Sequence, residues 1–222
     1  MYVVKFTDRE PGMEGRWEGP DWKHVRTLAV SHFRPEGSLH RPKTLAKLLY
    51  TRRGIAGIFH VEDNYVRCVH HCYLDPVYKD SCVGIAFRPG AETEHFSFEF
   101  SCGGTLRACF VTTADDAEDG LRVFMPLSRR DAASVRIYHS LPPMVEPEIA
   151  EPTVWLLEFF IPFSIVEKFL CKPLTVRGNE WQANLYKCGD STSHPHWASW
   201  APLRSNKIQA IDSFGKIRFE EA

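Results

Sequence analysis

The segment from Trp181 to Asp190 carries the side chains best suited to chemistry in this sequence. Polar and apolar residues alternate along it, and this alternation predicts a strand whose two faces differ. The predicted packing face carries Trp181, Ala183 and Leu185. The opposite face carries Gln182, Asn184 and Tyr186. Amide and hydroxyl groups on that second face can exchange hydrogen bonds with a ligand.

Aromatic and imidazole residues follow this strand directly. Gly189, Asp190 and Pro195 are typical of a turn that ends a strand, so we expect the next side chains to lie on a loop beside the polar face. These side chains are His194, His196, Trp197 and Trp200. A saccharide needs this mixture, because its C–H face packs against flat rings while its hydroxyl groups need amides, carboxylates and ammonium groups.

A second alternating segment, from Glu94 to Ser101, supplies a carboxylate. Its phenylalanines share one face, which we predict to be a core face, and Glu99 projects from the other face. We expect Glu99 and Asn184 to stand on neighbouring strands and to form a polar platform. The alternative interpretation is an ordinary solvated sheet face.

The sequence therefore predicts one hollow in which polar side chains gather beneath an indole ring. The predicted ligand-binding residues are Glu99, Asn184, Tyr186, Lys187, Asp190, His196, Trp197 and Trp200. The alternative for each tryptophan is core or rim packing, which is the commoner fate of tryptophan in a β-sandwich. Trp155 and Trp181 lie inside strand patterns, and we expect both to pack in the core.

Enzymatic chemistry is the second hypothesis, although the chain contains no GxSxG, P-loop, GxGxxG or HExxH motif. The candidate catalytic residues are Glu99, His194 and His196, with Lys187 as a further acid or base. Glu99 and Asp190 could form the carboxylate pair of a glycoside hydrolase, in which the separation of the two groups decides the mechanism. A lyase or isomerase acting on a sugar is equally open.

Asp75 and Asp80 bring two carboxylates into one short segment, and hard oxygen ligands of this kind can hold calcium. The sequence thus predicts Ca²⁺ as a candidate cofactor, with an Asp-led turn as the alternative. The thiols and imidazoles between Cys68 and Cys72 are zinc ligands by type, but their spacing is unlike that of zinc knuckles.

Composition narrows the classes of partner. Lysine and arginine number 27 against 28 aspartates and glutamates, and no basic run carries interleaved aromatics, so we expect no nucleic-acid partner. No apolar run is long enough to span a membrane, and the charged first twenty residues contain no signal-peptide core. Seven cysteines, an odd number, suggest free thiols and a cytoplasmic location. The sequence makes no prediction about oligomeric state.

Strand-like runs separated by glycine, proline and aspartate fill most of the chain. They are 45–50, 55–61, 83–87, 96–100, 106–112, 135–138, 154–161, 182–186 and 215–219. One short helix is predicted from Pro162 to Leu170, and segments 114–120 and 140–152 are predicted loops. This pattern predicts an all-β fold, a single antiparallel β-sandwich of jelly-roll type, formed by one domain over residues 1–222.

Five short segments, in this order, resemble the carbohydrate-binding family 9-like domains. They are Lys79-Asp80-Ser81-Cys82-Val83, Phe98 to Thr105, Ile161-Pro162-Phe163, Asn184 to Asp190 with His196, Ser199 and Trp200, and Phe214 to Ile217. The resemblance runs from about Trp22 to Phe219. It implies one β-sandwich, calcium in some members, and sugar binding in modules attached to xylanases. Gly84 stands where the family pattern has an acidic residue, and residues 208–213 replace its usual Phe-His-x-Pro.

The function predicted from these observations is recognition of a mono- or oligosaccharide, linked to carbohydrate catabolism. An enzyme on the same fold is the alternative. A protein-interaction sandwich that has lost its sugar site is a third hypothesis, consistent with the two departures from the family pattern.

Overall fold

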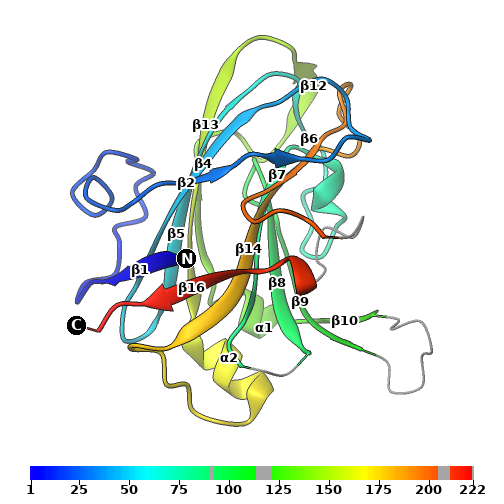
Figure 1. Ribbon diagram of the computed structural model, residues 1–222. Coiled ribbons are helices and arrows are strands. Elements are labelled where there is room, and N and C mark those ends of the chain that lie inside the picture. The colour runs from blue at the N-terminus through cyan, green and yellow to red at the C-terminus, as the bar shows by residue number, and fades with distance from the viewer. Residues whose placement is uncertain (91–92, 114–121, 205–210, 222) are drawn as a thin grey trace.

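The computed structural model describes residues 1–90, 93–113, 122–204 and 211–221, which form two facing β-sheets (Figure 1). In the first sheet the strand order is β10-β9-β8-β7-β14-β16. These strands are β10 (Arg122–Pro126), β9 (Leu106–Thr113), β8 (His95–Ser101), β7 (Cys82–Arg88), β14 (Glu180–Cys188) and β16 (Gly215–Phe219). Every pairing within this path is antiparallel.

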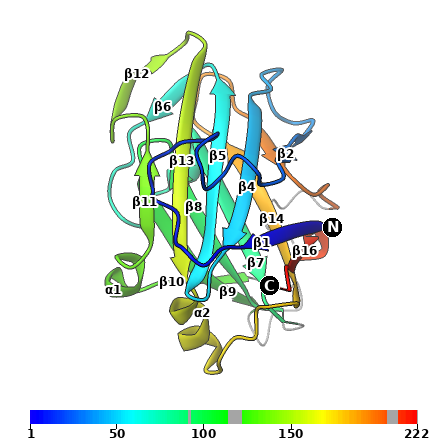
Figure 2. The ribbon, with the colours of Figure 1, turned by 90° about the vertical axis from the view of Figure 1, so that its left-hand side faces the viewer.

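The second sheet has the order β4-β5-β13-β11, with β2 beside β4, and faces the viewer in Figure 2. Its strands are β2 (Leu28–Val30), β4 (Lys43–Tyr50), β5 (Gly54–Asp63), β13 (Thr153–Pro162) and β11 (Arg136–His139). The long pairing of β5 with β13 runs from Gly54 with Pro162 to Asp63 with Thr153. It brings Asp63 to the end of the sandwich opposite Pro162.

Strand β1 (Tyr2–Phe6) joins the two sheets. It pairs in parallel with β16, where Tyr2 faces Ile217, and in parallel with β4, where Phe6 faces Tyr50. All other pairings among the described strands are antiparallel. The predicted antiparallel sandwich is therefore confirmed, and the parallel seam at β1 is a feature that the sequence pattern did not predict.

Smaller elements close the ends of the sandwich. Strand β15 (Trp197–Ser199) extends the first sheet beside β14 and pairs with β3 (His32–Phe33), while β6 (Val66–Cys68) pairs with β12 (Val145–Ile149). The helical elements are α1 (Arg129–Ala132), α2 (Phe163–Leu170) and the 3-10 turns η1 (Val77–Lys79) and η2 (Ile211–Ser213).

Aromatic side chains fill the space between the sheets. Phe96, Phe98 and Phe100 are fully buried there, as the alternation in their strand predicts. Phe100 stacks on Phe159 from the second sheet, with ring centroids 5.2 Å apart. Trp155 and Trp181 are also buried, which confirms their predicted place in the core. Complete burial of such side chains stabilises the fold by roughly 1.5–3 kcal/mol each.

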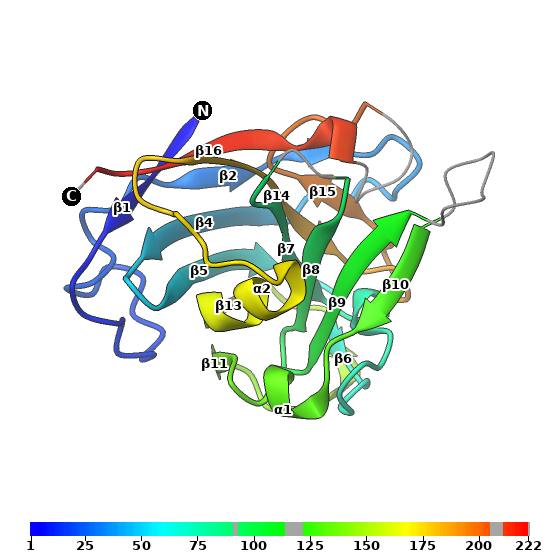
Figure 3. The same cartoon turned by 90° about the horizontal axis from the view of Figure 1, so that it is seen from below.

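Helix α2 covers the end of the sandwich seen from below in Figure 3. Pro162 precedes the first residue of the helix in an extended conformation, with φ −65° and ψ 136°. Cys171 ends the helix in the left-handed region, with φ 51°. Phe163, Ile165 and Val166 are buried against the core. The helix predicted from Pro162 to Leu170 is thus confirmed to within one residue.

The nine predicted strands all form, and the prediction fails in other places. The expected loop 140–152 is wrong in part, because β12 lies within it despite the prolines that interrupt the pattern. The expected single helix is wrong because α1 also forms, with Ser128 capping its first turn. The pattern also missed β1, β2, β3, β6, β10 and β15. The predicted loop 114–120 lies outside the described residues.

All seven cysteines are free thiols in this fold, as predicted. Among the residues that the structure describes, no helix has the length and apolar composition needed to cross a membrane.

Candidate functional site

A row of side chains crosses the outer face of the first sheet, on the side away from the core. Strand register places Arg107 opposite Glu99, Glu99 opposite Gly84, and Gly84 opposite Tyr186. Because partners in register share a face, these positions form one line across four strands, which we call the outer row. The alternation of each strand puts the outer row opposite the phenylalanine core.

The charged end of the outer row is an ion pair. The Nη1 atom of Arg107 donates to Oε2 of Glu99 at 2.7 Å, and the two side chains are 21% and 13% exposed. Burial opposes the charge of the Arg107 guanidinium, but the Glu99 carboxylate outweighs this effect and raises the pKa of Arg107. A half-buried, charged donor and acceptor therefore stand side by side at the surface.

Gly84 leaves the middle of the outer row without a side chain. A Cβ atom at this position would lie 2.9 Å from the carbonyl oxygen of Phe98 and 3.6 Å from Cγ of Glu99. The family pattern would put a second carboxylate here, next to Glu99. With glycine instead, Glu99 has Arg107 as its charged partner, and no side chain lies between Glu99 and the buried Tyr186.

Two aromatic residues flank the outer row. The guanidinium carbon of Arg107 lies 5.6 Å from the ring centroid of Tyr78, which belongs to η1. The guanidinium carbon of Arg34 lies 5.4 Å from the ring centroid of Trp197, which belongs to β15. Asp190 connects them, because its carboxylate accepts from Trp197 Nε1 at 2.6 Å and its backbone N–H donates to the Tyr78 carbonyl at 3.1 Å. Burial raises the pKa of Asp190, against the hydrogen bond from Trp197 and the charge of Arg34.

Asn184 lies on the same outer face but is covered. Its Nδ2 group donates to the carbonyls of Ala201 and Ser213 at 3.1 and 3.0 Å, and its Oδ1 accepts from the N–H groups of Ala201 and Leu185 at 2.9 and 3.0 Å. The amide is thus fully engaged in fastening the segment after β15 to β14. The structure assigns Asn184 to positioning that segment.

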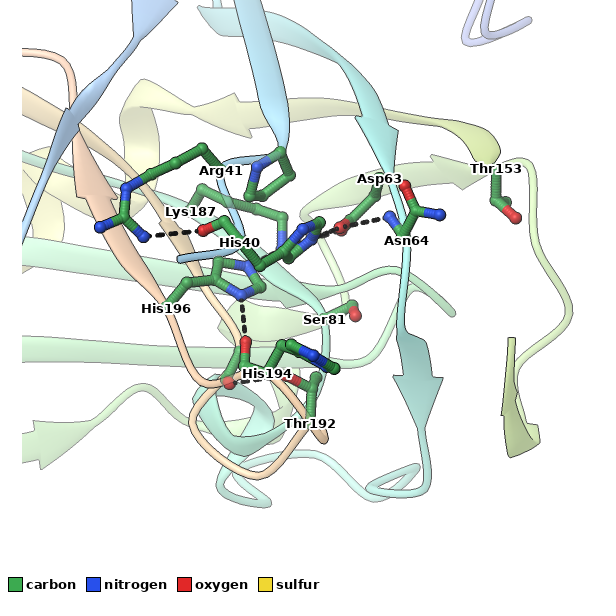
Figure 4. A network of polar contacts seen from close by, with 12 residues as sticks. His40, Arg41, Asp63, Asn64, Ser81, Thr153, Lys187, Thr192, His194 and His196 are labelled. Carbon is green, nitrogen blue, oxygen red and sulfur yellow. Dashed lines mark hydrogen bonds and ion pairs between the residues drawn. The ribbon is translucent and has the colours of Figure 1, made fainter. Parts of the chain in front are cut away.

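Lys187 points the other way, into the space between the sheets, where its side chain is 0% exposed. Its Nζ lies 3.0 Å from Asp63 Oδ2, 2.7 Å from His196 Nε2 and 3.2 Å from the carbonyl of Cys188 (Figure 4). We call Asp63, Lys187, His196 and His40 the inner network. It lies where β5 and β14 end, at the end of the sandwich opposite α2.

The histidines of the inner network differ in their roles. The Nδ1 atom of His196 lies 2.9 Å from the carbonyl of His194 and must donate to it, so Nε2 is the acceptor for Lys187. Burial and the nearby Lys187 charge lower the pKa of His196 to about 3, which keeps the ring neutral. His40 lies 2.7 Å from Asp63 Oδ1, and His194 stacks on Tyr65 with centroids 3.6 Å apart.

Asp63 balances the inner network electrically. Burial opposes its charge, but Lys187 and the hydrogen bond to His40 outweigh burial and hold the pKa of Asp63 well below its ordinary value of 3.8. The Asp63 carboxylate is therefore charged within the sandwich, and it is one of three protein acceptors within 3.2 Å of Lys187 Nζ.

The structure brings together only part of the predicted ligand-binding set. Glu99, Tyr186, Asp190 and Trp197 share the outer face, and Asn184 lies on that face beneath the covering segment. Lys187 and His196 belong to the inner network, while Trp200 packs against Tyr2 at 6.5 Å between ring centroids. The expectation of one shared hollow is therefore wrong.

The catalytic candidates are separated in the same way. Glu99 lies on the outer face, whereas His196 is inside the sandwich and His194 stacks on Tyr65 beside it. Arg107, Tyr78 and Arg34 were missed as site residues. Alternation in the strand that begins at Leu106 could have revealed Arg107. It places the Arg107 side chain on the face opposite the core, as alternation in the preceding strand does for Glu99.

The predicted calcium ligands have other partners. Both oxygens of the buried Asp80 carboxylate are in use, since Oδ2 accepts from the N–H groups of Val69 and His70 at 3.1 and 2.9 Å and Oδ1 lies 3.1 Å from His70 Nδ1. Asp75 accepts from the N–H of Cys72 at 2.8 Å. Asp80 does not fit a calcium site, because proton donors lie at both of its carboxylate oxygens. Within the described ranges, no three His, Cys, Asp or Glu residues are grouped to hold a metal.

The fold and the outer row together define a β-sandwich with polar and aromatic side chains on the outer face of one sheet. The family model for carbohydrate-binding family 9 matches residues 21–219. The chain belongs to this family, which confirms the resemblance drawn from the sequence and the prediction of a carbohydrate-binding protein. Among curated proteins, no sequence matches the chain.

Solved structures share the fold. A protein from Bacteroides uniformis ATCC 8492, for which carbohydrate binding has been proposed, is similar at a TM-score of 0.81 and 23% identity, with 98% of each chain covered. A family 9 carbohydrate-binding module from Caldicellulosiruptor kristjanssonii in complex with glucose is similar at a TM-score of 0.62 and 10% identity, with 99% of this chain and 96% of that chain covered. A family 9 carbohydrate-binding module from the same organism in complex with cellotriose is similar at a TM-score of 0.64 and 10% identity, covering 100% of this chain and 94% of that chain.

Proposed function

We propose that this chain binds a carbohydrate on the outer face of the first sheet, above the outer row and between Tyr78 and Trp197. The observation that carries the proposal is the half-buried pair of Glu99 and Arg107 flanked by these two aromatic rings. The pair offers acceptors and donors to sugar hydroxyl groups, and the rings offer apolar surface to the C–H face.

Aromatic stacking alone supports only weak binding. A ring contributes on the order of 1 kcal/mol beyond the area that it buries, so we expect micromolar to millimolar dissociation constants. The ion pair and the Asp190 hydrogen bond hold their side chains in place before a ligand arrives, which reduces the entropy lost on binding. Preorganisation of this kind supports specificity for one arrangement of hydroxyl groups.

The similar structures guide the choice of ligand. Two of them hold glucose and cellotriose, so glucose units are the first sugars to test. We propose that this binding serves carbohydrate catabolism, because the family includes modules attached to xylanases.

Calorimetric titration of glucose and cellotriose tests this proposal. We expect Trp197→Ala and Glu99→Gln each to weaken binding about tenfold, because an aromatic contact or a charged hydrogen bond is lost. Trp17→Ala is the matched control, since Trp17 packs against the cluster of Trp22 and Phe160 on the outside of the second sheet. Wild-type affinity in both outer-row variants would refute the site, and product formation from either sugar would favour an enzyme.

A further inference from the structure

A pocket of 810 Å³ lies at the α2 end of the sandwich, at the opposite end from the inner network. Residues from β1, the turn between β4 and β5, the end of β13 and the start of α2 line it. Its size falls in the range of small-molecule sites, about 300–1,000 Å³. The pocket shares no lining residue with the outer row.

The wall of this pocket is positively charged. The arginines that line it are Arg52, Arg53, Arg136 and Arg177, and the acidic residues are Glu10 and Glu167. Four guanidinium groups against two carboxylates leave a formal excess of two positive charges. This excess contrasts with the whole chain, whose formal net charge is −1.

Both carboxylates of the wall are already engaged. Glu10 bridges two arginines, with Oε1 3.2 Å from Arg53 and Oε2 2.8 Å from Arg136. Glu167 accepts from the backbone N–H of Leu174 at 3.0 Å. By contrast, Arg177 forms no ion pair with any carboxylate in the described part of the chain. Its charge remains available to a ligand.

Aromatic rings orient the guanidinium groups. Arg136 lies 4.7 Å from the centroid of Phe160, and Arg177 lies 5.4 Å from that of Phe6. A guanidinium over a ring keeps its N–H groups available at its edges, where a carboxylate or phosphate can accept two hydrogen bonds at once. Phe163 and Tyr50 also line the pocket but are largely buried, whereas Phe6 and Leu174 are half-buried and offer apolar surface beside these donors.

The start of α2 adds to the positive potential. Pro162, at the N-cap, has no side-chain cap, and Phe163 and Ser164 of the first turn line the pocket. The N–H of Phe163 donates to the carbonyl of Arg53 at 2.8 Å, which ties the helix start to the arginine-bearing turn. Helix N-termini favour negative charge.

We propose that this pocket is a second ligand site, which binds a sugar bearing an anionic group, with a carboxylated sugar such as a uronate as the favoured class. The anionic group lies against Arg177 and Arg136, and the C–H face of the ring packs on the half-buried apolar side chains of Phe6 and Leu174. This site does not depend on the outer row, so either site can be lost without the other.

Titrations of the full chain with glucuronate, glucose 6-phosphate and glucose test the proposal. We expect glucuronate to bind more tightly than neutral glucose at low salt and to weaken as salt is added, because charge drives the contact. If glucose 6-phosphate binds more tightly than glucuronate, the pocket recognises a phosphate and the proposed preference for a carboxylate is wrong. No binding of either anion at millimolar concentration would overturn the proposal.

Arg177→Gln is the diagnostic variant. We expect it to weaken glucuronate binding about tenfold or more through loss of a charged hydrogen bond. Arg218→Gln, on β16 and outside the pocket, is the matched control and should bind as the wild type. Unchanged affinity in Arg177→Gln, with an unchanged melting temperature, would overturn the site. Loss of glucuronate binding in Trp197→Ala would instead assign that ligand to the outer row.

Discussion

Lys187 is held inside the protein by three acceptors within 3.2 Å of its Nζ atom. Burying such a group is costly, and the cost is offset only while its partners remain. Asp63 carries the balancing charge, and His196 and a backbone carbonyl satisfy the remaining protons. The inner network thus makes each of its members indispensable to the others.

Replacement of Lys187 by methionine tests this dependence. Lys187→Met leaves Asp63 buried without its countercharge, so we expect the free energy of unfolding to fall by about 3–5 kcal/mol. Urea denaturation followed by circular dichroism measures it. The double variant Asp63→Asn with Lys187→Met should recover much of the loss, because it leaves no unpaired charge. Simple addition of the two single effects would contradict the coupling.

His196 makes stability depend on pH. Its folded-state pKa of about 3 lies below the ordinary value of 6.5, so below pH 6.5 the unfolded chain takes up a proton that the folded chain does not. The stabilisation is therefore present above 6.5 and is lost as the pH falls toward 3. We expect a loss of about 2 kcal/mol between pH 8 and pH 5.

Denaturation of the wild type and of His196→Gln at a series of pH values isolates this effect. The variant should lose most of the pH dependence between 5 and 8, because glutamine does not titrate. Asp63 contributes in the same direction but only below its ordinary pKa of 3.8. Equal slopes for the two proteins would assign the pH dependence to other groups.

At the scale of the strand, β14 explains both the success and the failure of the site prediction. Alternation correctly predicted the strand, its core face and the outward direction of Tyr186. Lys187 follows Tyr186 by one residue and must therefore point inward, so the same rule could have removed it from the outer face. Its partner Asp63 lies on β5, far away in the sequence, and no local pattern predicts that pairing.

Glycine in β5 permits a close ring contact in the second sheet. A Cβ atom on Gly57 would lie 2.3 Å from Cζ of Phe159 and 2.9 Å from Cδ2 of Leu48. We expect Gly57→Ala to lower the free energy of unfolding by about 1–3 kcal/mol through overpacking. Gly12→Ala is the control, because its Cβ would meet no atom closer than 3.4 Å. Equal melting temperatures for the two variants would refute this account.

At the scale of the molecule, composition and strand spacing were enough to predict the sandwich, since nine of its strands are strand-like runs separated by glycine, proline and aspartate. The sheet order and the parallel seam at β1 were beyond reach, because they depend on contacts between distant segments. The arginine-lined pocket was also missed, since its charged residues come from five separate parts of the chain.

We expect the whole chain to unfold as one unit, because a single hydrophobic cluster includes side chains of both sheets and β1 pairs with each sheet. Thermal transitions followed by tryptophan fluorescence and by far-ultraviolet circular dichroism should coincide. Val4→Ala, which removes buried atoms from β1, should shift both curves to lower temperature by the same amount. Two separated transitions would contradict the prediction of one domain over residues 1–222.

The pairing of β1 with β16 also has a consequence for biosynthesis. On the ribosome, β1 is made long before β16, so the edge of β1 that pairs with β16 has no partner until β16 emerges. An unpaired edge is a template for contacts between nascent chains. Chaperone binding to this edge would protect it until residues 215–219 emerge, and slow release of those residues would delay the completion of the first sheet.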